Sequence, residues 1–260
     1  MAFAQPIARP GRPIEGAVAT QGVSDRVAFL RKTYGLLGVS LIAFAAFTAG
    51  MMRFATETSF YFSSWATHSR LSWFLVLMLF AGVGYVAQRM SFSQTSRAVQ
   101  YLGLAMTVVV QSLLLQPILW GLIGMFGNRA MLASGVLLSG QATVILMQAV
   151  VITLAIFIGL TLTVFLTKKD FSFLRGALTV GLFAAMGVIL ASLAFGFSLG
   201  ALFCGAIILL MAGYILYETS LVMSYFPPQA YVAAALMLFS TIATLFWYVL
   251  QLLMSLNDRR

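Results

Sequence analysis

Seven long stretches of the chain are almost purely apolar and are hardly interrupted by charge. A helix that crosses a membrane needs about 20 mostly apolar residues. Only 8% of the 260 residues are charged and 62% are hydrophobic, whereas a soluble domain carries roughly 25% charged residues. This chain therefore lacks the polar side chains to cover a water-soluble fold, which excludes a cytosolic enzyme, a nucleic-acid-binding domain and a disordered protein. The predicted fold class is an all-α polytopic membrane protein.

The apolar stretches predict seven transmembrane helices, separated by charged or turn-forming segments such as TKKDFSFLRG and SYFPPQA. Pro117 predicts a kink or an end in the third span. The glycine-rich stretch that follows Pro117 predicts a hairpin or an interfacial turn. The predicted spans cover residues 34–52, 71–87, 98–117, 141–166, 177–195, 201–223 and 232–254.

The first 23 residues differ in composition from the rest of the chain. They contain Pro6, Pro10 and Pro13 and lack the apolar core of a secretory signal. We expect residues 1–23 to form a mobile cytoplasmic tail. Residues 24–260 are expected to form a single seven-helix transmembrane domain.

Basic residues are distributed unevenly between the two sides of the predicted bundle. Cytoplasmic loops are enriched in Lys and Arg. The side that holds the N-terminus carries ten basic residues before the last span, and the other side carries three. We therefore expect a cytoplasmic N-terminus, in a bacterial inner membrane or, alternatively, an organelle membrane. The net charge of +9 follows this pattern, and no basic patch with interleaved aromatic residues predicts a nucleic-acid partner. The expected partner is the lipid bilayer.

Glu218 is the only one of the six carboxylates that lies within an apolar stretch, LLMAGYILYETSLVM. An ionisable residue inside a span is a functional-site hypothesis by default. Glu218 is thus the candidate titrating gate residue and the candidate cation site. The alternative is a carboxylate that reaches the headgroup region or forms a fixed structural pair. Arg89, at the cytoplasmic end of the second span, is the candidate partner that would close a gate.

A polar stripe marks the last span. Thr241, Thr244, Tyr248 and Gln251 are spaced by 3, 4 and 3 residues, which places them on one face of a helix. Two interpretations stay open for this stripe. It either lines a polar path beside Glu218, or it forms hydrogen bonds between helices.

Motifs for catalysis or for a resident cofactor are missing from the sequence. The chain has one histidine, His68, and one cysteine, Cys204. Zinc-ligand spacings, a phosphate-binding loop and the metalloprotease motif HExxH are absent. We therefore expect neither an enzyme nor a cofactor-dependent protein.

Several segments together resemble the transmembrane Bax inhibitor motif family, whose bacterial branch includes YccA-like and YetJ-like proteins. The segments are FLRKTYGLLGVSL, FIGLTLTVFLTKKDFSFLRGAL, GYILYETSLVM and AALMLFSTIATLFWYVLQLL. The resemblance covers about residues 26–256. It implies seven spans, with six helices around a central seventh. It also implies a pH-sensitive calcium leak channel whose sensor is a pair of aspartates on the sixth and seventh spans, latched by an arginine from the second.

In this resemblance, Glu218 occupies the position of the first aspartate and Arg89 that of the latch arginine. Thr241 occupies the position of the second aspartate, which is a departure from the family pattern. Calcium prefers several oxygen ligands, usually with more than one carboxylate. The first hypothesis is therefore a pH-responsive cation leak channel, with Ca²⁺ as the candidate transported ion and weakened divalent binding. The alternative is a bacterial inner-membrane regulator that binds and modulates an ATP-dependent membrane protease, as the resemblance implies for some bacterial members. The N-terminal tail of this chain would then be the segment that the protease engages.

Overall fold

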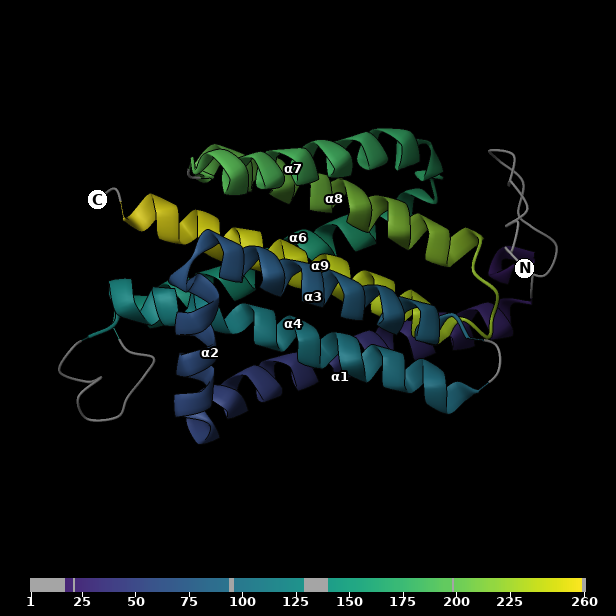
Figure 1. The fold of residues 1–260 in the computed structure, drawn as a ribbon. Helices are drawn as coiled ribbons and strands as arrows, with labels where there is room; N and C mark the ends of the chain where they lie inside the picture. The colour runs from purple at the N-terminus through teal and green to yellow at the C-terminus, as the bar shows by residue number, and fades with distance from the viewer. Residues whose placement is uncertain (1–16, 21, 94–95, 129–139, 198, 259–260) are drawn as a thin grey trace.

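The computed structural model describes residues 17–20, 22–93, 96–128, 140–197 and 199–258. Within this part of the chain, seven helices are long and apolar enough to cross a membrane, which confirms the predicted seven-span, all-α integral membrane protein (Figure 1). The spans are α1 (Val23–Phe54), α3 (Arg70–Ser91), α4 (Arg97–Phe126), α6 (Gln141–Thr167), α7 (Arg175–Phe195), α8 (Ala201–Ser224) and α9 (Tyr231–Asn257). The short elements are η1 (Val18–Thr20), α2 (Thr56–His68) and η2 (Ser172–Leu174).

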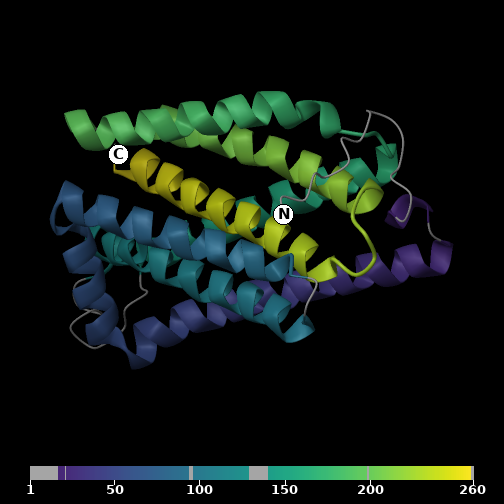
Figure 2. The same cartoon turned by 45° about the vertical axis from the view of Figure 1, so that its right-hand side comes forward.

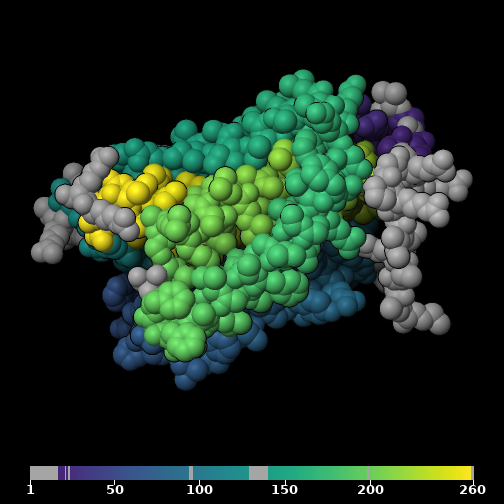
Figure 3. Space-filling model, turned by 90° about the horizontal axis from the view of Figure 1, so that it is seen from above, coloured from purple at the N-terminus to yellow at the C-terminus, as the bar shows by residue number. Residues whose placement is uncertain are grey.

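The last span, α9, organises the bundle. It packs against α1, α3, α4, α6 and α8, whereas α7 packs on α8. In the most apolar 18-residue window of α9, 72% of the residues are buried, more than in any other span. Figures 1 and 2 show α9 between the α1–α4 layer and the α7–α8 pair, and in Figure 3 α7 lies on the outside of α8. Five spans therefore pack closely on α9, and the arrangement of six helices around a central seventh stays an expectation from the resemblance.

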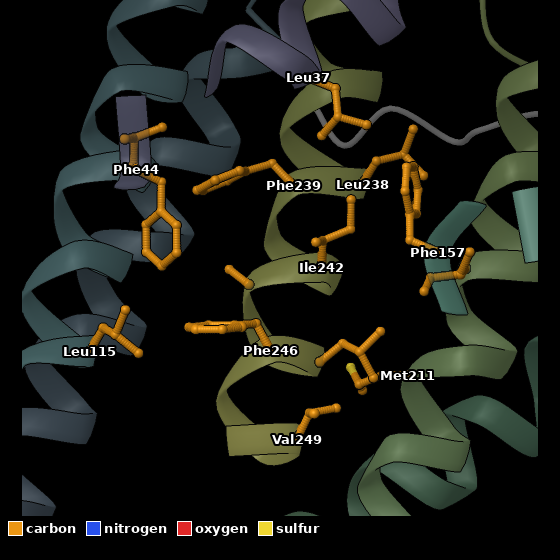
Figure 4. Close-up of a cluster of buried hydrophobic side chains, with 14 of the residues drawn as sticks. Leu37, Phe44, Leu115, Phe157, Met211, Leu238, Phe239, Ile242, Phe246 and Val249 are labelled. Carbon is orange, nitrogen blue, oxygen red and sulfur yellow. The ribbon is translucent and has the colours of Figure 1, made fainter. Parts of the chain in front are cut away.

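Large apolar side chains fix the position of α9. Figure 4 shows Phe239, Ile242 and Phe246 of α9 facing side chains from four other spans. The rings of Phe239 and Phe246 meet Phe44 of α1 edge-on, with centroids 5.7 and 6.5 Å apart. The other partners drawn are Leu37 of α1, Leu115 of α4, Phe157 of α6 and Met211 of α8. The apolar faces of α9 thus contact several neighbouring helices, which is expected of a helix in an interior position.

The third predicted span differs from the structure at Pro117. The prediction that the span could end there is wrong, because Pro117 lies inside α4, which continues to Phe126. The segment 118–126, predicted as a hairpin or interfacial turn, is therefore helical. A buried polar network beside the proline holds α4 to its neighbours: Ser59 of α2 donates to Gln116 Oε1 at 2.7 Å, and Trp120 donates to Ser59 Oγ at 2.9 Å. Such polar contacts make proline tolerable inside a membrane helix.

The polar stretch between the first two spans forms the separate helix α2, which runs across the end of the bundle in Figure 1. Its Phe60, Tyr61 and Trp65 are exposed. Aromatic side chains of this kind favour the boundary between membrane and water. We infer that α2 lies along this boundary, at the end of the bundle opposite to η1.

Part of the predicted tail is packed against the bundle. Val18 is fully buried, and its N–H donates to the carbonyl oxygen of Phe226 at 2.9 Å. The short helix η1 contacts α1 and α8. Residues 17–20 of the predicted tail thus contact the transmembrane domain, and the boundary at residue 23 stays a prediction. Residues 1–16, and with them most of the predicted tail, lie outside the described residues.

Asp170 ties the α6–α7 connection to the end of α8. Its carboxylate accepts hydrogen bonds from Tyr225 Oη at 2.6 Å, from Ser220 Oγ at 3.2 Å and from the backbone N–H of Ser172 at 2.8 Å. Burial alone would raise the pKa of Asp170, but these hydrogen bonds outweigh it and lower the pKa. The ionised form of Asp170 is thus the form that fastens the loop.

Close packing of α3 against α4 depends on Gly103. A Cβ atom at Gly103 would lie 2.5 Å from the carbonyl oxygen of Ala87 and 2.7 Å from Ser91 Oγ. Small residues at such crossings let two membrane helices approach closely. We predict that Gly103→Ala costs about 1–3 kcal/mol of stability, because overpacking forces the helices apart. The measurement is the thermal unfolding midpoint in detergent.

The matched control for this prediction is Gly82→Ala on α3, where no atom lies within 4 Å of the added Cβ. Alanine is the better helix former, so this variant is expected to be neutral or slightly stabilising. An equal loss of stability in both variants would contradict the close approach at Gly103.

A second prediction concerns Asp170→Asn. Because the folded-state pKa is lowered, the stabilisation is present above the ordinary value of 3.8 and is lost as the pH falls through the folded-state value. We expect the variant to unfold a few degrees below wild type at about pH 7. The difference should narrow below about pH 4. Asp258→Asn serves as the control. A difference in unfolding temperature between wild type and Asp170→Asn that does not change with pH would refute the role of the ionised carboxylate.

Candidate functional site

A pocket of about 380 Å³ lies between α3, α4, α8 and α9. Its polar lining comes from all four helices and includes the one carboxylate that the sequence places inside a span. The lining residues used below are Leu77, Phe80, Gln88, Thr107, Gln111, Glu218, Ser240 and Thr241.

The structure brings Glu218 and Thr241 together in this pocket. Glu218 is only 6% exposed. Thr241 Oγ1 donates a hydrogen bond to Glu218 Oε1 at 2.9 Å, and Glu218 Oε2 has no hydrogen-bond partner among the described residues. A buried carboxylate oxygen without a partner is costly unless a proton, a cation or water occupies it. The pocket supplies the space for such a partner.

Arg89 is not brought to Glu218. Its guanidinium donates from Nε to Tyr85 Oη at 3.0 Å and lies over the Tyr85 ring, 5.1 Å from the centroid. The side chain of Arg89 is exposed, and within the described residues no ion pair joins it to Glu218. Its neighbour Gln88 does line the pocket. The role of Arg89 as a latch stays a prediction for another state of the molecule.

Only one residue of the polar stripe of α9, Thr241, lines the pocket. Thr241 lines the pocket, but Thr244 donates to the carbonyl oxygen of Ser240 in its own helix at 2.8 Å. The ring of Tyr248 packs edge-on against Phe203 of α8, with centroids 6.1 Å apart. Gln251 is partly buried further along α9, beyond the pocket lining. Of the four residues of the stripe, only Thr241 therefore lines the pocket beside Glu218. The role of Thr244, Tyr248 and Gln251 in a polar path stays a prediction.

Sequence reasoning missed four polar residues of the pocket: Gln88, Thr107, Gln111 and Ser240. Thr107 and Gln111 are four residues apart in α4 and so share a face, which is the signal that could have identified them. The Gln111 side chain makes no hydrogen bond within the described residues, so its amide is available to whatever enters the pocket.

The pocket extends along about half of the bundle. From Gln88 to Leu77 its lining runs 11 residues along α3, which is about 16 Å of helix. Toward the α2 end, Phe80 packs with Ala66 and Val76 in an apolar cluster. The rings of Trp73 and Trp247 stack at 6.3 Å between α3 and α9. Apolar packing therefore separates the pocket from the α2 end.

The end of the bundle near Gln88 is strongly basic. The described basic residues near this end are Arg26, Arg31, Lys32, Arg89, Arg97, Lys168, Lys169 and Arg175, whereas the α2 end holds Arg53 and Arg70.

Within the described residues, no three His, Cys, Asp or Glu side chains gather as metal ligands. The carboxylate of Glu218 thus stands with neutral oxygen ligands from threonine, serine and glutamine.

Comparisons with known proteins agree with this architecture. The family model described as inhibitor of apoptosis-promoting Bax1 matches residues 26–258. Bax inhibitor 1 of Schizosaccharomyces pombe is 28% identical over 250 residues, which cover 93% of this chain and 81% of that protein. Protein lifeguard 4 of Mus musculus is 25% identical over 256 residues, covering 93% and 91%.

A bacterial relative extends the comparison. An uncharacterized protein of Pseudomonas aeruginosa is 29% identical over 246 residues, which cover 92% of this chain and 93% of that protein. No solved structure matches the chain. Because the family model matches nearly the whole chain, including every described span, the chain belongs to the Bax inhibitor family.

Proposed function

We propose that the protein is a pH-responsive cation leak pathway in which Glu218 is the titrating group. The observation that carries this proposal is the unpartnered Oε2 atom of Glu218 at the wall of a pocket of about 380 Å³. Membership in the Bax inhibitor family is consistent with a leak function, and the basic end of the bundle supports a cytoplasmic N-terminus in an inner membrane.

The chemistry follows from the ligands. A proton and a cation compete for the same carboxylate oxygens of Glu218, because each neutralises the buried charge. Thr241, Ser240 and Gln111 add neutral oxygens around the pocket. A site with one carboxylate suits a monovalent cation better than Ca²⁺, which usually takes more than one. Conduction would also require the apolar cluster around Phe80 and the Trp73–Trp247 stack to part, as in hydrophobic gates.

The first test of this function is Glu218→Gln, which keeps the size of the side chain and removes its charge. Wild-type protein in liposomes is expected to pass K⁺ or Ca²⁺ at a rate that changes between about pH 5 and pH 8. The Gln variant should lose most of that pH dependence, because the group that binds the proton is gone. The measurement is ion flux reported by indicators trapped in the liposomes.

Glu57→Gln on α2 is the matched control, since Glu57 is an exposed carboxylate outside the spans. It should keep the wild-type pH profile. Retained pH dependence in Glu218→Gln would refute the mechanism. No flux at any pH from folded protein would refute the leak itself and favour the alternative, a regulator of a membrane protease. A flux that rises in acid and is altered by Arg89→Gln would support the latch that the family resemblance implies.

A second prediction concerns the ion. Thr241→Asp places a second carboxylate beside Glu218, at the position where Thr241 Oγ1 now lies 2.9 Å from Oε1. Two carboxylates favour a divalent cation, so the ratio of Ca²⁺ to K⁺ flux should rise several-fold. Thr241→Asn is the control, because it has the same shape and no charge. An equal ratio in both variants would mean that ion choice is made elsewhere.

A further inference from the structure

A second pocket lies at the basic end of the bundle and shares no lining residue with the Glu218 pocket. Its volume is about 40 Å³, room for a group the size of a few water molecules. The pocket lies between the start of α1, the end of α6, the turn that follows α6, and the end of α8. The lining residues are Arg26, Val164, Lys168, Lys169, Ser220, Met223 and Ser224.

Three cations from different parts of the chain converge on this small space. Arg26 belongs to the first turns of α1, and Lys168 and Lys169 follow the end of α6. Lys168 takes the left-handed conformation, with φ at 51°, as it ends the helix. Together they give this end of the bundle a local excess of positive charge, which attracts anions. Within the described residues, none of the three forms an ion pair.

The nearest carboxylate, Asp170, offsets only one of these three positive charges. Asp170 is next to Lys169 in the chain, but its oxygens accept hydrogen bonds from Tyr225, Ser220 and the Ser172 backbone. The hydroxyl of Ser220 is likewise engaged with Asp170. The hydroxyl of Ser224 makes no hydrogen bond in the described part of the chain and is available as a donor. The pocket thus offers three positive charges and one free hydroxyl.

The place of the pocket indicates the source of the anion. It lies where α1 starts and where α6 and α8 end, which is the boundary between membrane and water. Val164 and Met223, both buried, form the apolar floor of the pocket. We propose that this pocket binds the phosphate group of an anionic phospholipid headgroup, whose glycerol and acyl carbons lie outside it in the bilayer.

The test uses the full chain in detergent and native mass spectrometry. Phosphatidylglycerol is the probe, and phosphatidylcholine, whose phosphate is compensated by a quaternary ammonium group, is the comparison without net charge. Wild type should bind phosphatidylglycerol at least tenfold more tightly. The double variant Arg26→Gln/Lys168→Gln should lose roughly thirtyfold in affinity, since each cation near an anionic lipid contributes about fivefold. Ser224→Leu should also weaken binding, because it fills the pocket without changing the charge.

The matched control is Arg31→Gln/Arg175→Gln, which removes two charges at the same end of the bundle but outside the pocket. It should change the affinity by less than about threefold. An equal loss in both double variants would overturn the proposal, since general surface charge would then explain binding. Inorganic phosphate that binds as tightly as phosphatidylglycerol would also overturn it, because the ligand would then be free phosphate. The Glu218→Gln flux measurement is independent of all these outcomes.

Discussion

Burial of α9 among five other spans is the constraint on which the rest of the structure depends. Phe239, Ile242 and Phe246 fill the spaces between α1, α4, α6 and α8, so each of these helices takes its position from the same central surface. In a bilayer, helices gain little by leaving lipid, and close packing has to hold them together. A central helix with large apolar side chains toward several neighbours satisfies this requirement, and it also places Thr241 beside α8.

The candidate site exists because this packing is incomplete at one point. Between α3, α4, α8 and α9 the helices leave a pocket, and Glu218 reaches it from α8 with one oxygen held by Thr241 and one without a partner. Toward the α2 end of the same helices, apolar contacts close the bundle, among them those of Val76 and the stacked rings of Trp73 and Trp247. A polar half and an apolar half along one axis are what a gated pathway needs.

The two pockets use opposite electrostatics at neighbouring depths. The Glu218 pocket holds a buried carboxyl group with one unpartnered oxygen within the membrane, and the smaller pocket gathers three basic side chains at its boundary. The first favours a proton, a cation or water beside Glu218, and the second attracts an anion. Asp170 links them structurally, since it fastens the lysine-bearing turn to Ser220, two residues beyond Glu218.

The sequence by itself determined the class of the protein. Seven apolar stretches, the isolated Glu218 and the distribution of basic residues follow from composition and spacing, because the bilayer imposes a length and a polarity on every span. It also identified the family through segments distributed along the chain. These features need no knowledge of which helix lies beside which, and the predicted spans were accordingly confirmed.

Only the tertiary structure decided which polar residues meet. Thr244, Tyr248 and Gln251 share a face of α9 with Thr241, yet the helices packed on that face direct only Thr241 to the pocket. Gln88 of α3 and Gln111 of α4 join it from elements distant in the chain, and Ser240 joins it from α9 itself. Arg89 lies against Tyr85, and Pro117 continues a helix because Ser59 and Trp120 stabilise its surroundings. Helical periodicity fixes the face of a residue, but the side chain's partners depend on helix packing, which no local pattern encodes.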